Sequence, residues 1–193
     1  RIYNSTGTLI NLTNSTTSPL FVNLTTQYDG IYYFNATACD LVNQCSDSET
    51  RNVTIDQDIP LINFTNPSET NNSILNRNNI LINVTSTDSA LANITIRLYN
   101  FTALINSTTT LTSTNYVNIT NLPSGRYFFN ATAYDRGGNS NSTETRTIFI
   151  DIDIPIINFT NPTEISGTYA NKNFILINVT STASLKGSNL SLS

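Results

Sequence analysis

Apolar and polar residues alternate with a period of two along most of this chain. In its short apolar runs every second residue is Asn or Thr, as in Ile62/Phe64, Ile82/Val84, Ile94/Ile96, Val117/Ile119 and Phe129/Ala131/Ala133. A period of two places successive side chains on opposite faces of a β-strand. No segment shows the 3.6-residue period of an amphipathic helix. The pattern predicts an all-β protein.

The alternating runs are bounded by turn-forming sequences such as TNP, STDS, LPSG and DRGGN. Between these turns we predict seven strands, over 59–66, 79–86, 92–99, 103–111, 115–120, 126–134 and 143–152. Seven short strands with a turn about every dozen residues are typical of an immunoglobulin-type sandwich, in which two sheets pack face to face.

The chain repeats itself at a distance of 95 residues. INFTNP stands at 62–67 and again at 157–162, and the whole of 30–67 aligns with 125–162. With one residue of slippage, RIYNST at the start of the chain matches RLYNFT in its middle. Self-similarity at a fixed period indicates a tandem array of one structural unit. We therefore predict tandem immunoglobulin-like β-sandwich repeats of about 95 residues.

The repeat predicts one complete unit and two partial ones. The complete immunoglobulin-like repeat covers 60–155, whereas 1–59 matches the C-terminal two-thirds of a repeat and 156–193 the N-terminal third. We expect the partial units to be completed by a continuing chain, as in a window on a longer array, or by strands from a neighbouring chain. Both alternatives predict partners that are adjacent repeats or identical chains, arranged end to end in a filament.

The last third of the unit resembles a known family. The pattern of leucine, proline, a glycine turn, a tyrosine-led strand, Asp-x-x-Gly-Asn and a strand ending in Asp and Pro is carried by Leu122, Pro123, Gly125, Tyr127, Asp135, Gly138, Asn139, Asp153 and Pro155. The first copy matches it at Tyr32, Asp40, Asn43, Asp58 and Pro60, without the turn glycines. This is similar to the Ig-like and fibronectin-III-like repeats of bacterial and archaeal cell-surface proteins. The resemblance implies the sandwich fold and a place in a surface filament or stalk.

The composition is polar but poor in charge. Charged residues make up 11% of the chain, where about 25% is usual, and their place is taken by 30 Asn, 31 Thr and 20 Ser. The nine Lys and Arg form no basic run and the net charge is −4, so we expect no nucleic-acid partner. No run approaches the roughly 20 apolar residues of a membrane helix, so we expect no membrane span in this segment.

Many asparagines stand in the triplet Asn-x-Ser/Thr, which is the acceptor sequence for N-glycosylation and is called a sequon below. Chance pairing of 30 Asn with 51 Ser and Thr in 193 residues gives about 8 sequons. The chain has 18, and 14 of them form seven pairs 95 or 96 residues apart. They begin at Asn4, Asn11, Asn14, Asn23, Asn35, Asn52, Asn63, Asn71, Asn83, Asn93, Asn100, Asn106, Asn118, Asn130, Asn141, Asn158, Asn178 and Asn189.

Two interpretations of the sequons differ in whether they carry sugar. Asn and Thr at i and i+2 share one face of a strand, so they could simply make an uncharged outer face. Lys, Arg and Glu are the usual residues of a soluble strand surface and are scarce here. We therefore predict a densely N-glycosylated surface, with covalent glycans as the only added groups and no cofactor.

The two cysteines, Cys39 and Cys45, flank the turn sequence DLVNQ. The second copy has Tyr134 and Ser140 at these positions, so the fold does not need them. Two cysteines without histidine cannot fill a zinc site, and the spacing is not Cys-x-x-Cys. We predict a disulfide that stabilises one hairpin, with two buried free thiols as the alternative.

Acidic residues mark both predicted junctions between units, where Asp56/Asp58 and Asp151/Asp153 precede Ile-Pro. Capped turns with solvated carboxylates are our preferred interpretation. Calcium is the alternative, but a full shell takes six or more oxygens and each junction shows only two acidic residues. Asp40 or Asp135 could approach a junction in space, which the sequence alone does not show. We predict no metal ligands.

The chain has no His, which leaves no Ser-His or Cys-His pair for nucleophilic catalysis. We predict no catalytic residues and no enzyme. The predicted function is that of a structural component of an extracellular or cell-surface filament or stalk. The alternatives are the shaft of an adhesin, a pilus-like subunit assembled by strand donation, and a spacer attached to an extracellular enzyme.

Overall fold

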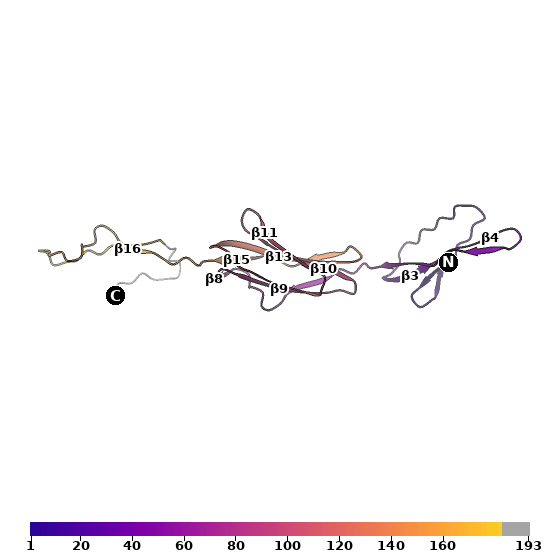
Figure 1. Cartoon of the computed structure of the whole chain (residues 1–193), viewed down its shortest axis with the longest axis horizontal. Coiled ribbons are helices and arrows are strands. Elements are labelled where there is room, and N and C mark those ends of the chain that lie inside the picture. The colour runs from indigo at the N-terminus through magenta and orange to yellow at the C-terminus, as the bar shows by residue number, and fades with distance from the viewer. Residues whose placement is uncertain (183–193) are drawn as a thin grey trace.

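The computed structural model describes residues 1–182, which form 17 β-strands joined by turns and loops. Three parts follow one another along the long axis of the molecule (Figure 1). The N-terminal part contains β1 (Ile2–Asn4), β2 (Leu9–Asn11), β3 (Gly30–Phe34), β4 (Thr37–Cys39), β5 (Cys45–Asp47) and β6 (Arg51–Ile55). The C-terminal part contains β16 (Ile157–Phe159) and β17 (Val179–Ser181). No helix of the described residues has the length and apolar character needed to cross a membrane.

The central part is a β-sandwich of two sheets. One sheet has the strand order β12 (Thr114–Ile119), β9 (Ile80–Thr87) and β7 (Leu61–Phe64). The other has the order β11 (Leu104–Thr110), β10 (Leu91–Tyr99), β13 (Gly125–Asp135), β15 (Arg146–Ile150) and β8 (Ser73–Leu75), and β14 (Ser140–Ser142) pairs with β13. Neighbouring strands are antiparallel, except that β15 and β8 are parallel. After β7 the chain crosses from the three-stranded sheet to the other sheet, where it forms β8.

The core lies between these two sheets because the alternating apolar residues all face inward. In β9 the side chains of Ile80, Ile82 and Val84 are fully buried, and in β13 Phe129 packs edge-on against Phe64 of the opposite sheet at 5.2 Å between ring centroids. Each fully buried side chain of this size contributes about 1.5–3 kcal/mol to folding. The core cluster contains only residues of the central part.

The repeat seen in the sequence returns in the hydrogen-bonded pairing. The N-terminal sheet has the order β2-β1-β3-β6, which is the order of their counterparts β11-β10-β13-β15. The C-terminal pair repeats the β7–β9 register, with Asn158 opposite Thr180 as Asn63 is opposite Thr85. Residues 95 positions apart therefore occupy equivalent places in equivalent sheets.

The prediction of an all-β sandwich is confirmed. Each of the seven predicted strands is present, with ends within three residues of the predicted ones. The prediction missed β8 and β14, which are three residues long and lie in Asn- and Ser-rich sequence without apolar alternation. The predicted unit boundaries at 59/60 and 155/156 fall between strands, and part of the range 156–193 lies outside the described residues.

Candidate functional site: glycan-acceptor surface and inter-unit junction

The sequon asparagines lie outside the core. None of the 17 in the described part of the chain is buried, and the last predicted one, Asn189, lies outside the described residues. Eight are exposed and nine are half-buried. The buried asparagine of the central part, Asn115, is 4% exposed and does not stand in a sequon. Its amide nitrogen donates to the backbone oxygens of Ile94 and Thr108, at 3.1 and 2.9 Å.

The outward position follows from the strand period. Asn83 stands between the fully buried Ile82 and Val84 in β9, and Asn130 between the fully buried Phe129 and Ala131 in β13. Because neighbours in a strand face opposite ways, a buried pair at i−1 and i+1 turns residue i to the outer face of its sheet. β9 and β13 belong to different sheets, so sequons occupy the outer faces of both. Whether these asparagines carry sugar stays a prediction.

The structure contains the predicted disulfide, Cys39–Cys45, in the hairpin β4–β5. The two residues lie directly opposite each other, as Tyr134 and Ser140 do in the equivalent hairpin β13–β14. The turn between the cysteines contains Asn43 with a φ of 62°, at the position where the second copy has Gly138 with a φ of 96°. The left-handed conformation is least costly for glycine, and asparagine tolerates it better than most residues. The disulfide therefore closes the hairpin that lacks the turn glycines.

The junction between the N-terminal and central parts is held by hydrogen bonds from both sides. On the N-terminal side, the backbone and side-chain nitrogens of Gln57 both donate to Asp29 Oδ1 at 3.0 Å. On the central side, Asn139 Nδ2 donates to the backbone oxygen of Asp56 at 2.9 Å, and Asn141 Nδ2 donates to that of Pro60 at 3.0 Å. A linker of a few residues is thereby fastened to both neighbours.

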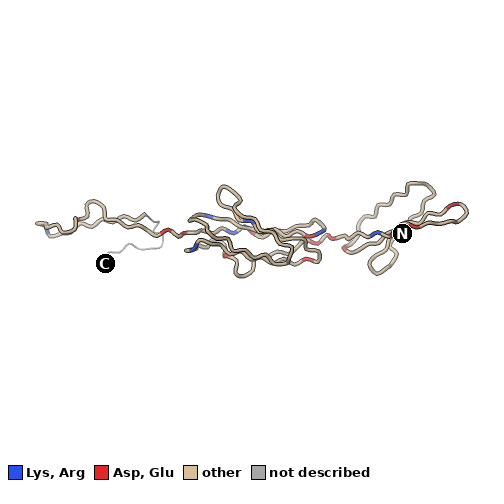
Figure 2. The backbone as a smooth tube through the Cα atoms, in the orientation of Figure 1, with Lys and Arg blue, Asp and Glu red and all other residues tan. Residues whose placement is uncertain are grey.

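Close approach of two backbones adds to this clamp. A Cβ atom on Gly137 would lie 2.8 Å from the backbone oxygen of Asp56 and 3.1 Å from its Cβ. The loop 135–139 therefore contacts the linker at a distance that only glycine permits. The acidic residues seen at this junction in Figure 2 lie where the linker meets the sandwich.

Three carboxylates meet at the same place. Asp56, Asp88 and Asp135 each have an oxygen within 4.8 Å of the others. Burial, followed by the charges of Asp135 and Asp88, raises the pKa of Asp56 above its ordinary value. Burial would also raise the pKa of Asp135, but hydrogen bonds from Asn139 and from the N–H groups of its turn outweigh it and hold that pKa below the ordinary value. The turn therefore stabilises the charged form of Asp135, whereas burial and repulsion from the neighbouring carboxylates destabilise the charged form of Asp56.

The sequence identified only one member of this cluster as a junction residue. Asp58, Asp151 and Asp153 belong to no comparable group in the part of the chain that the structure describes. Asp88 and Asp135 were not assigned to the junction, although both stand in the turn sequences STDS and DRGGN. In a sandwich these two turns lie at the end where the first strand begins. This topology could have indicated that Asp88 and Asp135 lie near the junction. The prediction of no metal ligands, with calcium at the junctions as its alternative, stays untested.

The second junction repeats part of the first. Ile152 N–H donates to Ser124 Oγ at 3.2 Å, and these two residues are the 95-residue counterparts of Gln57 and Asp29. Asp151 N–H donates to the backbone oxygen of Leu75 at 2.9 Å. The C-terminal end of the unit is therefore fastened to its own sandwich in both copies.

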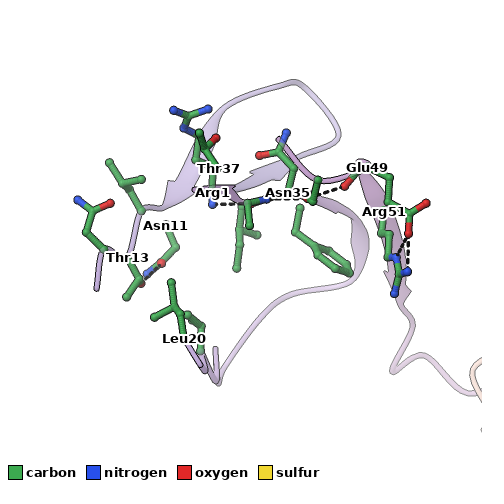
Figure 3. Close-up of a pocket in the computed structure, with 15 residues that line it drawn as sticks. Arg1, Asn11, Thr13, Leu20, Asn35, Thr37, Glu49 and Arg51 are labelled. Atoms are coloured by element: carbon green, nitrogen blue, oxygen red, sulfur yellow. Dashed lines mark hydrogen bonds and ion pairs between the residues drawn. The ribbon is translucent and has the colours of Figure 1, made fainter. Parts of the chain in front are cut away.

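A pocket of about 500 Å³ opens on the N-terminal sheet (Figure 3). Its apolar lining includes Ile2, Phe34 and Ala36, and Asn11 and Thr37 lie at its rim. In the central part the counterparts of the three apolar residues, Leu98, Phe129 and Ala131, are fully buried under the second sheet. The pocket is thus the inner face of a sandwich sheet, and we assign no ligand to it.

Comparisons with known proteins add no identity. No family model and no curated protein matches the chain. Among solved structures it is similar to an engineered protein (TM-score 0.38, 10% identity, 48% of this chain and 20% of that one). It is similar to the fibronectin(III)-like modules of CbhA from Clostridium thermocellum (0.36, 22%, 63% and 62%) and to dimeric latent PorU from Porphyromonas gingivalis (0.35, 14%, 66% and 13%). At these TM-scores the likenesses carry no argument, and the fold assignment rests on the strand topology described above.

Proposed function

We propose that this chain is a structural component of an extracellular or cell-surface filament or stalk, built from sandwich units whose outer faces carry N-linked sugars. It acts mechanically and not as a catalyst. The observation that carries the proposal is the position of the sequons, since all 17 that are described stay outside the core and 13 of these have a counterpart sequon 95 or 96 residues away.

The small share of charged residues supports the proposal that the surface is glycosylated. Open sheet edges and uncharged strand faces pair with other chains unless something prevents it, and native proteins usually prevent it with charge. Only 11% of these residues are charged. Neutral, strongly hydrated sugars would do the same work on the outer faces and would leave the surface insensitive to pH.

The clamped junction supports a stiff array. Units joined through small polar interfaces normally move relative to one another. Here the linker is bonded to Asp29 on one side and to Asn139 and Asn141 on the other, and Pro60 is fully buried. Few backbone angles are left free to act as a hinge, so successive units would keep one direction.

The alternatives predict the same stiff, sugar-coated units and differ in their surroundings. An adhesin shaft or an enzyme spacer would have a binding or catalytic domain in the same protein. A pilus-like subunit would have its partial sandwiches completed by strands of another copy.

The test combines mass and shape. Native material is weighed under denaturing conditions before and after chemical removal of glycans, and the same material is imaged by electron microscopy. We expect a large loss of mass on stripping and unbranched rods with the period of one sandwich. An unchanged mass, or compact particles in place of rods, would contradict the proposal.

A further inference from the structure

The sequon asparagines do not all have the same freedom to accept a sugar. N-glycosylation joins the amide nitrogen Nδ2 to C1 of an activated sugar phosphate. The N–C1 bond forms, the C1–O bond to phosphate breaks with its electron pair on the phosphate, and the nitrogen gives up one proton. The nitrogen must therefore be accessible, and it keeps a single hydrogen afterwards. The structure shows which of these nitrogens already have a partner.

Asn83 and its counterpart Asn178 are bonded to a neighbouring segment in the same way in both copies. Asn83 Nδ2 donates to the backbone oxygen of Asn66 at 2.8 Å, and Asn178 Nδ2 donates to that of Asn161 at 3.0 Å. Around Asn83 the backbone is bonded as well, since its N–H donates to Ser68 Oγ at 2.6 Å. The same bond joins the N–H of Asn178 to a threonine hydroxyl at 2.7 Å. The recurrence at 95 residues indicates a structural contact.

A second pair shows the same behaviour. Asn35 Nδ2 donates to Thr50 Oγ1 at 3.3 Å, and its counterpart Asn130 Nδ2 donates to Thr145 Oγ1 at 3.2 Å. A fifth asparagine, Asn141, donates to the linker at Pro60. We call these five residues the clasp asparagines: Asn35, Asn83, Asn130, Asn141 and Asn178.

The other 12 described sequon asparagines donate no hydrogen bond from Nδ2 to the described part of the chain, and we call them the open asparagines. Several use only the amide oxygen, as Asn100 does in accepting from the hydroxyl of Thr102, the third residue of its own sequon, at 3.0 Å. The open asparagines are Asn4, Asn11, Asn14, Asn23, Asn52, Asn63, Asn71, Asn93, Asn100, Asn106, Asn118 and Asn158.

Most members of the two classes differ in where they lie in the central sandwich. The exceptions are the open Asn93, on the middle strand β10, and the clasp residue Asn141, on the short strand β14. The clasp residues Asn83 and Asn130 lie on β9 and β13, the middle strands of their sheets, with neighbours on both sides. The four edge strands are β7, β12, β11 and β8. Each has an open asparagine on it or shortly before it: Asn63 on β7, Asn118 on β12, Asn106 on β11 and Asn71 before β8.

We propose that the open asparagines are the sugar acceptors, with at least one sugar chain at each of the edge strands β7, β12, β11 and β8, and that the clasp asparagines stay unmodified as hydrogen-bond donors. This inference rests on the proposed function and assigns the sites within it. Its consequence is that sugars stand where unpaired backbone N–H and C=O groups would otherwise invite another strand.

The geometry of the glycosylated amide excludes two of the clasp residues, Asn83 and Asn35, on a second ground. A substituted amide is planar and trans, so the sugar C1 lies on the same side as the amide oxygen. The Oδ1 atoms of Asn83 and Asn35 are fully buried and have no hydrogen-bond partner. A sugar on either residue would therefore start on the side that faces the protein. Transfer before folding would meet the same obstacle when the strand packs.

Site-resolved mass spectrometry of glycopeptides tests the assignment, with the full chain expressed in an N-glycosylating host. We expect sugar at the open asparagines of the edges, and occupancy at least tenfold lower at the clasp asparagines. Equal occupancy in the two classes would overturn the inference and leave the proposed function standing. Absence of sugar from all sites would overturn the proposed function itself.

Matched variants separate the sugar from the hydrogen bond. Thr120→Val removes the Asn118 sequon and Thr85→Val removes the Asn83 sequon, and both keep the asparagine. We expect Thr120→Val to lower the mass by one glycan and Thr85→Val to leave it unchanged. Asn83→Gln should lower the unfolding midpoint of sugar-free protein, whereas Asn118→Gln should not. A glycan lost from Thr85→Val would refute the assignment of Asn83 even if Asn83→Gln did not fold.

Discussion

At the scale of single residues, asparagine has three distinct roles in this protein. The open asparagines donate no hydrogen bond from the amide nitrogen to the described part of the chain, and the clasp asparagines hydrogen-bond neighbouring segments to each other. Asn115 is buried and bonds two backbone oxygens inside the sandwich. One side chain type serves all three roles because its amide carries both a donor and an acceptor and no charge.

Asn115 allows the contribution of a buried asparagine to stability to be measured without interference from glycosylation, since it stands in no sequon. Replacing it with leucine keeps the branched shape of four side-chain heavy atoms and leaves the oxygens of Ile94 and Thr108 without this donor. Loss of a buried partner costs about 1–3 kcal/mol, so we expect Asn115→Leu to lower the free energy of unfolding by that amount in denaturant titration. Asn76→Leu, at an exposed position, is the control. Equal effects of the two changes would show that the buried bonds contribute nothing.

The raised pKa of Asp56 predicts a pH dependence with a defined sign. A carboxyl whose pKa is higher in the folded than in the unfolded protein binds more protons when folded, so it favours folding below its ordinary pKa of 3.8. This contribution disappears as the pH rises through the folded value. We expect Asp56→Asn to raise the thermal unfolding midpoint at pH 7 and to leave it unchanged at pH 3. Asp58→Asn, outside the carboxylate cluster, should show no such difference, and a larger gain at pH 3 than at pH 7 would reverse the assigned sign.

At the scale of the element, the same hairpin is stabilised differently in the two copies. β13–β14 has the turn DRGGN with two glycines, and β4–β5 has Asn43 in the left-handed position and a disulfide across its strands. All six residues of β4 and β5 are exposed. The hairpin therefore has little buried surface of its own, and the covalent bond takes over that contribution.

Reduction of the disulfide should loosen β4–β5 alone. The entropy of closing a loop of seven residues corresponds to about 2.4 kcal/mol, so amide hydrogen exchange in this hairpin should accelerate by about 50-fold. The hairpin β13–β14 of the same molecule is the internal control. If both hairpins change equally, or neither does, the cross-link has no local stabilising role.

At the scale of the whole molecule, the junction decides whether the array is a rod or a string of beads. The linker passes between Asp29 of one unit and the loop 135–139 of the next. Gln57 donates two hydrogen bonds to Asp29, and Asn139 and Asn141 donate one each to the linker. Each bond is of modest strength, but together they act on a segment of few residues. Acting on so short a segment, these bonds support the proposed stiffness of the junction.

Gly137→Ala should break this arrangement. The new Cβ would lie 2.8 Å from the backbone oxygen of Asp56, and overpacking of this kind costs about 1–3 kcal/mol. We expect cleavage at residues 56–59 by an aspartate-specific protease to rise by about tenfold, with the sandwich still folded. Gly125→Ala is the matched control, because its Cβ would make an ordinary 3.7 Å contact with Tyr127. Unchanged cleavage in Gly137→Ala would show that the junction is flexible already.

The positions of the strands could be predicted from local sequence patterns. Which segments lie beside each loop could not be predicted from them. Ile82, Val84, Phe129 and Ala131 were predicted to face inward from their spacing alone, and they are fully buried. The strands β8 and β14 were missed, because pairing with β15 and β13 holds them in place without an apolar pattern of their own. The Asp56–Asp88–Asp135 cluster was missed for a related reason, since its members come from three turns that only the sandwich brings together.

Two properties of the chain therefore have different origins. Period-two alternation was sufficient to predict the sheet faces and the outward position of the sequons, because side-chain direction in a strand depends only on residue parity. The 95-residue repeat predicted the equivalent sheets of the N-terminal and central parts, and a longer array stays a proposal. The division into open and clasp asparagines required the folded sandwich. A hydrogen bond between Asn83 and Asn66, or between Asn141 and Pro60, depends on which other segment lies beside the strand. Because every sequon has the same Asn-x-Ser/Thr pattern, the sequence alone does not distinguish the two classes.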